Sequence, residues 1–167
     1  MVEASALLVD AVLPAQPIRQ WVLSVPYPLR FLFASQPKVM GKVLGIVYRT
    51  IASHLLKKAG YRTTQAQTGA VTLIQRFGSA LNLNIHFHML FLDGVVAEDR
   101  HGVSRFFRVK APSHAELVAL AHQLSHRVGR YLEREIWWLP SSSRQNIYPG
   151  IDLPIQSLIP PIQSFIG

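Results

Sequence analysis

The sequence predicts an α+β domain with a mostly antiparallel sheet and helices packed on one face. Two observations indicate this class. β-rich runs alternate with long segments whose apolar residues recur at helical spacing, and residues 85–92 alternate strictly between two sets of side chains. The expected order of helix, strand, helix, strands and helix suits an α+β arrangement. With 167 residues, 49% of them hydrophobic, the chain is long enough for one domain with a core.

The first half of the chain is expected to hold a helix, a strand and a second, longer helix. ASALLVDAVL is typical of an amphipathic helix, and RQWVLSVP of a strand closed by prolines. KVMGKVLGIVYRTIASHLLKKAG has helical spacing and two lysines in its last turn. Gly60 is therefore the expected end of that helix.

The second half is expected to hold strands followed by a long helix. Short polar segments separate the β-rich runs, which predicts neighbouring antiparallel strands from AVTLIQRF, NIHFHMLFLDG and VSRFFRVK. SHAELVALAHQLSHRVGRYLERE then reads as a helix, with Ser113 as N-cap and Glu116 completing a capping box.

The composition changes after Glu135. Residues 136–167 are rich in proline and contain a near repeat, PIQSLI followed by PIQSFI. Such a density of proline disfavours helices and central strands. We therefore expect one folded domain over residues 1–135 and an irregular tail over residues 136–167.

The positive charge is unevenly distributed. The net charge is +8, and no acidic residue lies between Asp10 and Asp93, whereas nine lysines and arginines do. Nucleic acid is the partner that such a region favours; an anionic membrane surface and simple solubility are the alternatives. The candidate DNA contacts are Arg19, Arg30 and Arg76. Three aromatic residues near them are candidates for stacking on bases, although core packing is the favoured use: Trp21, Phe31 and Phe33.

The absence of cysteine excludes a disulfide framework and a cysteine-based zinc site, and favours a reducing, cytoplasmic setting. No apolar run is long enough to cross a bilayer. Glu3 and Asp10 stand where a signal peptide would carry positive charge. The sequence thus predicts a protein with no membrane partner.

Two histidine pairs stand at spacings that metal sites use. On a strand, His86 and His88 share one face, where their imidazoles could hold a divalent cation; otherwise each would bond a neighbouring backbone group. On the predicted second long helix, His122 and His126 have zinc-ligand spacing. Gln123 replaces the glutamate that a metalloprotease needs, so exposed helix polarity is the favoured interpretation.

The block GAVTLIQRFGSALNLNIHFHMLFLDGV, with RQWVLSVPYPLRFLFA and ALLVDAVLP upstream, resembles the two-tyrosine, rolling-circle insertion-sequence transposases. These belong to the HUH (His-hydrophobic-His) endonuclease superfamily, and the resemblance covers roughly residues 2–134. It implies that the His strand is central in an antiparallel sheet, between AVTLIQRF and QWVLSVP.

The resemblance also implies a chemistry. The histidine pair would hold Mg²⁺ or Mn²⁺ beside a scissile phosphate of single-stranded DNA at a transposon end, and a tyrosine would attack to form a phosphotyrosine link. Family members add a third metal ligand. Gln75, on the preceding strand, is the candidate, with Asp93 as the reserve.

The sequence departs from the family in two respects. It has no cysteine-rich zinc-binding segment, and no two of its tyrosines have the spacing of the family's paired nucleophiles; Tyr131 is the single candidate, with a structural role favoured. Together with the unrelated tail, this predicts a truncated transposase that is inactive alone, although a lineage-specific extension would also explain the tail. The alternatives are an enzyme that nicks single-stranded DNA and an inactive remnant that only binds it.

Overall fold

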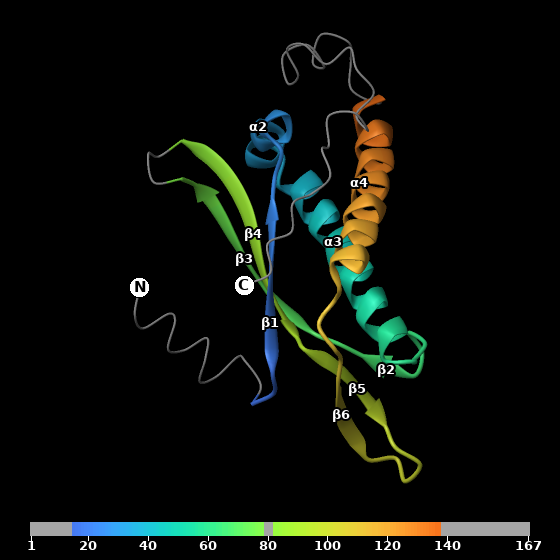
Figure 1. Ribbon diagram of the computed structural model, residues 1–167. Coiled ribbons are helices and arrows are strands. Elements are labelled where there is room, and N and C mark those ends of the chain that lie inside the picture. The colour runs from blue at the N-terminus through green and yellow to red at the C-terminus, as the bar shows by residue number, and fades with distance from the viewer. Residues whose placement is uncertain (1–14, 79–81, 138–167) are drawn as a thin grey trace.

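The computed structural model describes residues 15–78 and 82–137. Within them the chain forms six strands and three helices (Figure 1). In chain order these are β1 (Ile18–Ser24), α2 (Tyr27–Ser35), α3 (Pro37–Lys58), β2 (Ala66–Gln67), β3 (Ala70–Phe77), β4 (Leu83–Leu92), β5 (Gly94–Glu98), β6 (Ser104–Arg108) and α4 (His114–Trp137). The helix expected at residues 4–13 and nearly all of the expected tail lie outside the described residues.

The strands form two antiparallel three-stranded sheets, β1-β4-β3 and β2-β5-β6. The α+β class and the antiparallel pairing are therefore confirmed. The His-bearing strand β4 lies between β1 and β3, as expected. The expectation that VSRFFRVK would extend the same sheet was wrong, because that segment is β6 and pairs with β5.

The chain passes from one sheet to the other at Asp93 and Gly94. Asp93 donates its backbone N–H to the carbonyl of Pro17, and its own carbonyl accepts from Val109. A Cβ on Gly94 would lie 2.3 Å from the backbone oxygen of Phe107, so only glycine fits at this point. This close approach lets β5 leave the first sheet and pair with β6.

The helix α2 was not expected from the sequence. Proline stands at its first or second position, where the fixed φ suits a helix start and the missing N–H costs nothing. The two prolines of VPYP thus end β1 and also begin the next helix.

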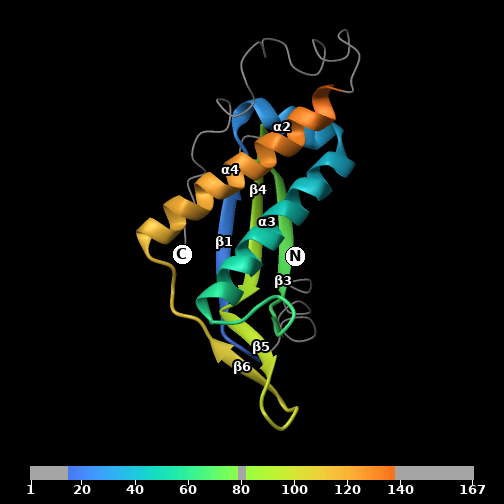
Figure 2. The same ribbon diagram turned by 90° about the vertical axis from the view of Figure 1, so that its right-hand side faces the viewer.

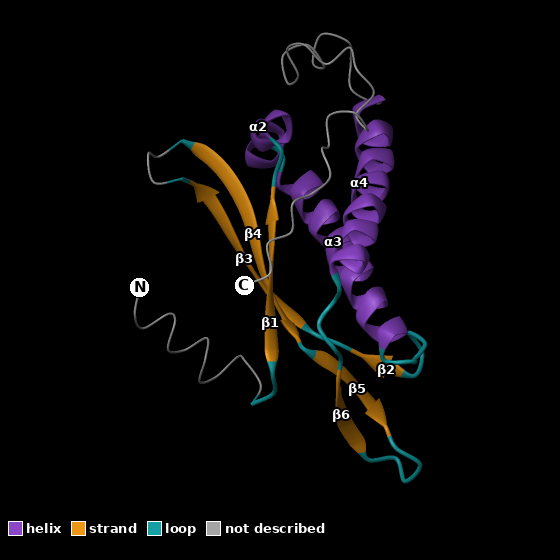
Figure 3. Cartoon of the chain, viewed as in Figure 1, coloured by secondary structure: helices purple, strands orange, loops and turns teal. Residues whose placement is uncertain are grey.

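Helices α3 and α4 run antiparallel across one face of the β1-β4-β3 sheet (Figure 2). Figure 3 shows the strands and helices as separate layers. Between the layers lies the core, to which β4 contributes its odd-numbered residues, each at most 2% exposed: Ile85, Phe87, Met89 and Phe91. Trp21 and Phe33 are also buried, which confirms their expected core role, whereas Phe31 is 58% exposed.

The end of α3 and the start of α4 are as the sequence indicates. Gly60 has φ of +80° just after α3. At the start of α4, Ser113 N–H donates to Glu116 Oε2 at 2.6 Å and Glu116 N–H to Ser113 Oγ at 3.3 Å, which is the expected capping box. Lys58 also donates to Glu116, and its hydrogen bond is the main cause that lowers the pKa of Glu116 to about 2. None of the described helices could cross a membrane.

Candidate metal centre

His86 and His88 lie side by side on the face of β4 that points away from the core. Both are half-buried, whereas their neighbours Ile85, Phe87 and Met89 are buried on the helix side. The two ring centroids are 6.4 Å apart. The strand period therefore separates the two imidazoles from the packed core and leaves them accessible on one surface.

The neighbouring strand β1 contacts both imidazoles at their Nδ1 atoms. Ser24 Oγ on β1 lies 2.9 Å from His86 Nδ1, and Gln20 Nε2 lies 3.0 Å from His88 Nδ1. With Nδ1 of each ring engaged by β1, the Nε2 atoms are the ones that could ligate a cation. Gln20 and Ser24 were not singled out from the sequence, although their spacing of four on a strand places them on one face.

Gln75 comes from β3, in register with His86. Its Oε1 lies 3.2 Å from His88 Nε2, and its Nε2 donates to the carbonyl of Phe77 at 3.1 Å, which orients the amide oxygen toward the imidazole. The structure thus brings Gln75 to the histidine pair, at the atom that would bind a metal.

The pKa of His86 is lowered from its ordinary value of 6.5. Burial is the largest cause, followed by the neighbouring His88 and the positive charge of Arg30. At neutral pH the ring of His86 is therefore uncharged, which is the form that ligates metals.

The donor set of two imidazole nitrogens and one amide oxygen fits a divalent cation such as Mn²⁺ or Mg²⁺. Within residues 15–78 and 82–137, no group of three or more His, Cys, Asp or Glu side chains could hold a metal ion. A third protein ligand would therefore have to be another side chain, and the Gln75 amide oxygen lies close enough to His88 to be a candidate.

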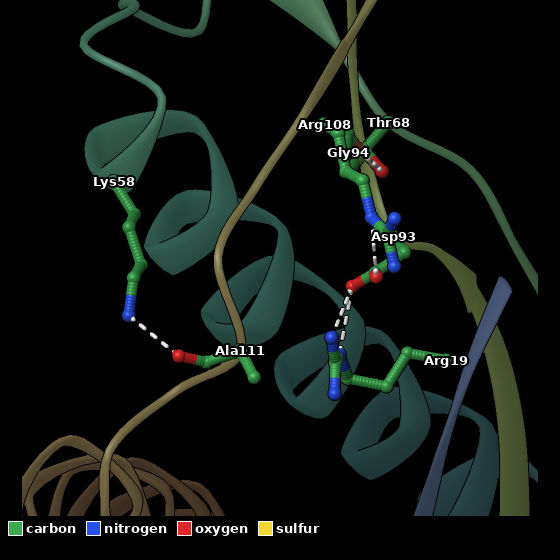
Figure 4. Close-up of polar contacts among 7 residues, drawn as sticks. All are labelled: Arg19, Lys58, Thr68, Asp93, Gly94, Arg108 and Ala111. Atoms are coloured by element: carbon green, nitrogen blue, oxygen red, sulfur yellow. Dashed lines mark hydrogen bonds and ion pairs between the residues drawn. The ribbon is translucent and has the colours of Figure 1, made fainter. Parts of the chain in front are cut away.

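Asp93, the reserve ligand, has a different role. It is 4% exposed, and its carboxylate accepts from Arg19 at 2.7 Å and lies 3.5 Å from Arg108 (Figure 4). Arg19 pairs with Phe91 across the strands, so it lies on the core side of the sheet, opposite the imidazoles. The candidate DNA contact Arg19 is therefore a structural partner of Asp93 and faces away from the histidine pair.

Of the other two candidate arginines, Arg30 is the one whose charge acts on the histidine pair. Arg30 on α2 donates to the carbonyls of Val25 and Leu83, and its charge acts on His86. Arg76 is exposed on β3 at the irregularity between Gln75 and Phe77. Both are cations at the end of the sheet where β4 begins.

Two exposed aromatic residues accompany Arg30 on α2. Tyr27 is 81% exposed and Phe31 is 58% exposed, and the Arg30 guanidinium lies 5.8 Å from the Tyr27 ring centroid. Their spacing of four places them on one face of the helix. The spacing of four between Tyr27 and Phe31 is visible in the sequence, but it indicates a shared face only once YPLRFLFAS is known to be helical.

Tyr131 lies on α4, which packs against the core side of the sheet. It is half-buried against the core, and its pKa is raised by burial and then by the charge of Glu135. The structure therefore places Tyr131 on the side of the sheet opposite the imidazoles. His122 and His126 are exposed on the same helix, as expected.

Residues 69–147 match the model of the family described as “Putative transposase”, Y2_Tnp. This segment is therefore similar to that family. The matched residues include β3 and β4, with the histidine pair and Gln75, and extend past the boundary expected at residue 135. Searches of curated proteins and of solved structures found no match to the chain. Transposases act on DNA, so the similarity of this segment to them favours a DNA partner.

Proposed function

We propose that the chain binds single-stranded DNA on the imidazole-bearing face of the β1-β4-β3 sheet, beside a divalent cation held by His86, His88 and Gln75. The observation that carries the proposal is the convergence of three potential ligands on one accessible face, within a transposase family segment. Mg²⁺ or Mn²⁺ bound there would act as a Lewis acid, polarising a DNA phosphate and stabilising negative charge.

The hydrogen bonds of the histidine pair suit metal binding. For Nε2 to ligate, Nδ1 must carry the proton and donate it. Ser24 Oγ can accept from His86 Nδ1, and the Gln20 amide can present its oxygen to His88 Nδ1 by rotating through 180°. When Nδ1 of His88 carries the proton, Nε2 no longer donates to Gln75 Oε1. The imidazole nitrogen and the amide oxygen can then both turn toward a cation.

The surface around the pair supports a nucleic-acid ligand. Arg30 supplies positive charge for phosphates, and the exposed rings of Tyr27 and Phe31 offer stacking platforms for unpaired bases. Stacking on exposed aromatic rings requires bases that are not paired inside a duplex. This combination therefore favours single-stranded over double-stranded DNA.

Strand cleavage would require a tyrosine hydroxyl at the metal-held phosphate. In the family chemistry that oxygen bonds to phosphorus and the bond to the 3′ oxygen breaks, leaving a 5′-phosphotyrosine and a free 3′-OH. Tyr131 lies on the opposite side of the sheet, and no two tyrosines of the chain have the paired spacing. We therefore propose binding without cleavage by this chain.

A second candidate function, nicking by a single tyrosine, is favoured by one observation. Tyr27 is exposed and begins the helix that follows β1, three residues after Ser24, whose hydroxyl contacts His86. If the chain has a nucleophile among its described residues, Tyr27 is a better candidate than Tyr131.

The test uses an end-labelled single-stranded oligonucleotide of random sequence with Mn²⁺, analysed on native and denaturing gels. We expect retardation on the native gel, weakened in the His86→Ala/His88→Ala variant, and no covalent band on the denaturing gel. A covalent band lost in Tyr27→Phe or in Tyr131→Phe would instead establish nicking and identify the nucleophile. Absence of retardation would refute DNA binding on this face.

A further inference from the structure

Helices α3 and α4 lie side by side on the face of the sheet away from the imidazoles (Figures 1 and 2). Side chains of both helices line a groove. Its volume is about 410 Å³. Five basic side chains and one aromatic ring line most of it: Arg49 from α3, and His126, Arg127, Arg130, Tyr131 and Arg134 from α4.

No acidic side chain lines this arginine groove. Within the described part of the chain, none of its four arginines forms an ion pair with a carboxylate. Arg127, Arg130 and Arg134 follow one another at spacings of three and four, so they lie on one helix face, where like charges repel. An anion in the groove would relieve that repulsion.

Several of the guanidinium groups are positioned by the fold. Arg127 donates to Thr50 Oγ1 at 3.1 Å, and Thr50 is 1% exposed. The Arg134 Nε donates to the carbonyl of Arg130 at 3.3 Å, and the Arg49 guanidinium lies over Gly45, 3.2 Å from where a Cβ would stand. Positioned arginines lose less conformational entropy on binding, and their planar forks match phosphate geometry.

The extent of the groove favours a polymeric anion. Arg127 and Arg134 are seven residues apart, which is about 10 Å along a helix axis. Successive phosphates of one DNA strand lie farther apart than the about 3.4 Å by which the strand advances along the duplex axis, so this row of arginines can meet about two of them. A single small anion could contact only part of the row.

We propose that the arginine groove binds the phosphodiester backbone of DNA, as a second contact separate from the imidazole-bearing face. The groove would recognise phosphate charge and not base sequence, because its arginines donate hydrogen bonds to phosphate. Its one aromatic ring, Tyr131, is half-buried and poorly placed to stack on a base. It goes beyond the proposed function, since it needs neither the metal nor the histidine pair. Single-stranded and duplex DNA share this chemistry, and the experiment separates them.

The test compares two double variants that lose the same charge. Arg130→Ala/Arg134→Ala removes two of the four arginines that line the groove. Arg62→Ala/Arg100→Ala removes two exposed arginines elsewhere on the surface. Affinities for a single-stranded and a duplex oligonucleotide are measured over a range of salt concentrations. EDTA is present throughout, because it removes any metal-dependent binding. Circular dichroism and the thermal midpoint confirm that both variants are folded.

We expect the groove variant to lose about tenfold in affinity and the control variant much less. The slope of log K against log salt should fall by about 1.8 for duplex or about 1.4 for single strands, as expected for two lost phosphate contacts. If only the single-stranded or only the duplex oligonucleotide shows the lower affinity and the smaller salt slope, that form of DNA is the ligand of the groove. His86→Ala/His88→Ala should retain the EDTA-resistant binding, so that failure of the metal site and failure of the groove are distinguishable.

Three outcomes would overturn the proposal. Equal losses in the two double variants would indicate a general charge effect, and an unchanged affinity in the groove variant would show that the groove does not contact DNA. Groove-dependent binding to phosphatidylserine vesicles, without groove-dependent binding to DNA, would assign the arginines to a membrane surface.

Discussion

The two faces of β4 differ although they belong to one ten-residue strand. On one face, Phe87, Met89 and their neighbours are at most 2% exposed and pack beneath α3 and α4. On the other face, His86 and His88 make hydrogen bonds to side chains of β1 and β3. The buried face therefore stabilises the fold, and the polar face is available for a ligand. Substitutions on the two faces should have different consequences.

The largest effect is expected on the buried face. Phe87 is fully buried and stacks with Phe33 at 6.3 Å between ring centroids. Phe87→Ala should lower the free energy of unfolding by about 3–5 kcal/mol, because the core cannot fill the cavity. His88→Ala, one residue away, should cost less than about 1 kcal/mol. Urea denaturation measures both, and similar losses would contradict the division between the faces.

A somewhat smaller effect is expected where the buried face continues past the end of β4. Asp93→Asn removes the charge partner of Arg19 at the junction of the two sheets, and should cost about 3 kcal/mol because the guanidinium remains in a partly buried site. The matched control is Asp99→Asn, whose partner Arg105 is 63% exposed, so that the lost ion pair is screened by water. Thermal unfolding should show a clear decrease in the first variant only. An equal decrease in both would refute a structural role for the buried pair.

The smallest effect is a pH dependence of stability from two histidines. The pKa values of His86 and His54 are lowered from 6.5, in each case mainly by burial. Below pH 6.5 the unfolded chain takes up protons before the folded chain does, so the free energy of unfolding should fall as the pH decreases from about 6.5 toward the lowered pKa values. His54→Asn/His86→Asn should make this dependence shallower. Denaturation at several pH values measures it, and an unchanged profile in the variant would exclude these two groups as its cause.

The local parts of this fold could be predicted from the sequence. Alternation along β4 predicted its two faces, whereas its neighbours on either side were expected from the family resemblance. The capping box at Ser113 and the helix end at Gly60 also depend on residues close in sequence. Such features follow from backbone preferences and hydrogen bonds within a few residues.

The parts that could not be predicted depend on contacts between distant residues. The division into two sheets requires the close approach of Gly94 to Phe107, and the role of Asp93 depends on Arg19, 74 positions away. The contacts of Gln20 and Ser24 with the imidazoles depend on the register of β1 against β4. Residue types and spacing alone do not determine these pairings.

The central claim, that the polar face of β4 holds a divalent cation, is tested most directly by thermal unfolding with and without Mn²⁺. A cation that binds only the folded chain raises the thermal midpoint by mass action. The wild-type chain should show this increase, His86→Ala/His88→Ala should lose it, and His122→Ala/His126→Ala, which removes two exposed imidazoles from α4, should keep it. An increase that survives in the first variant and disappears in the second would place the metal on the helix and contradict the claim.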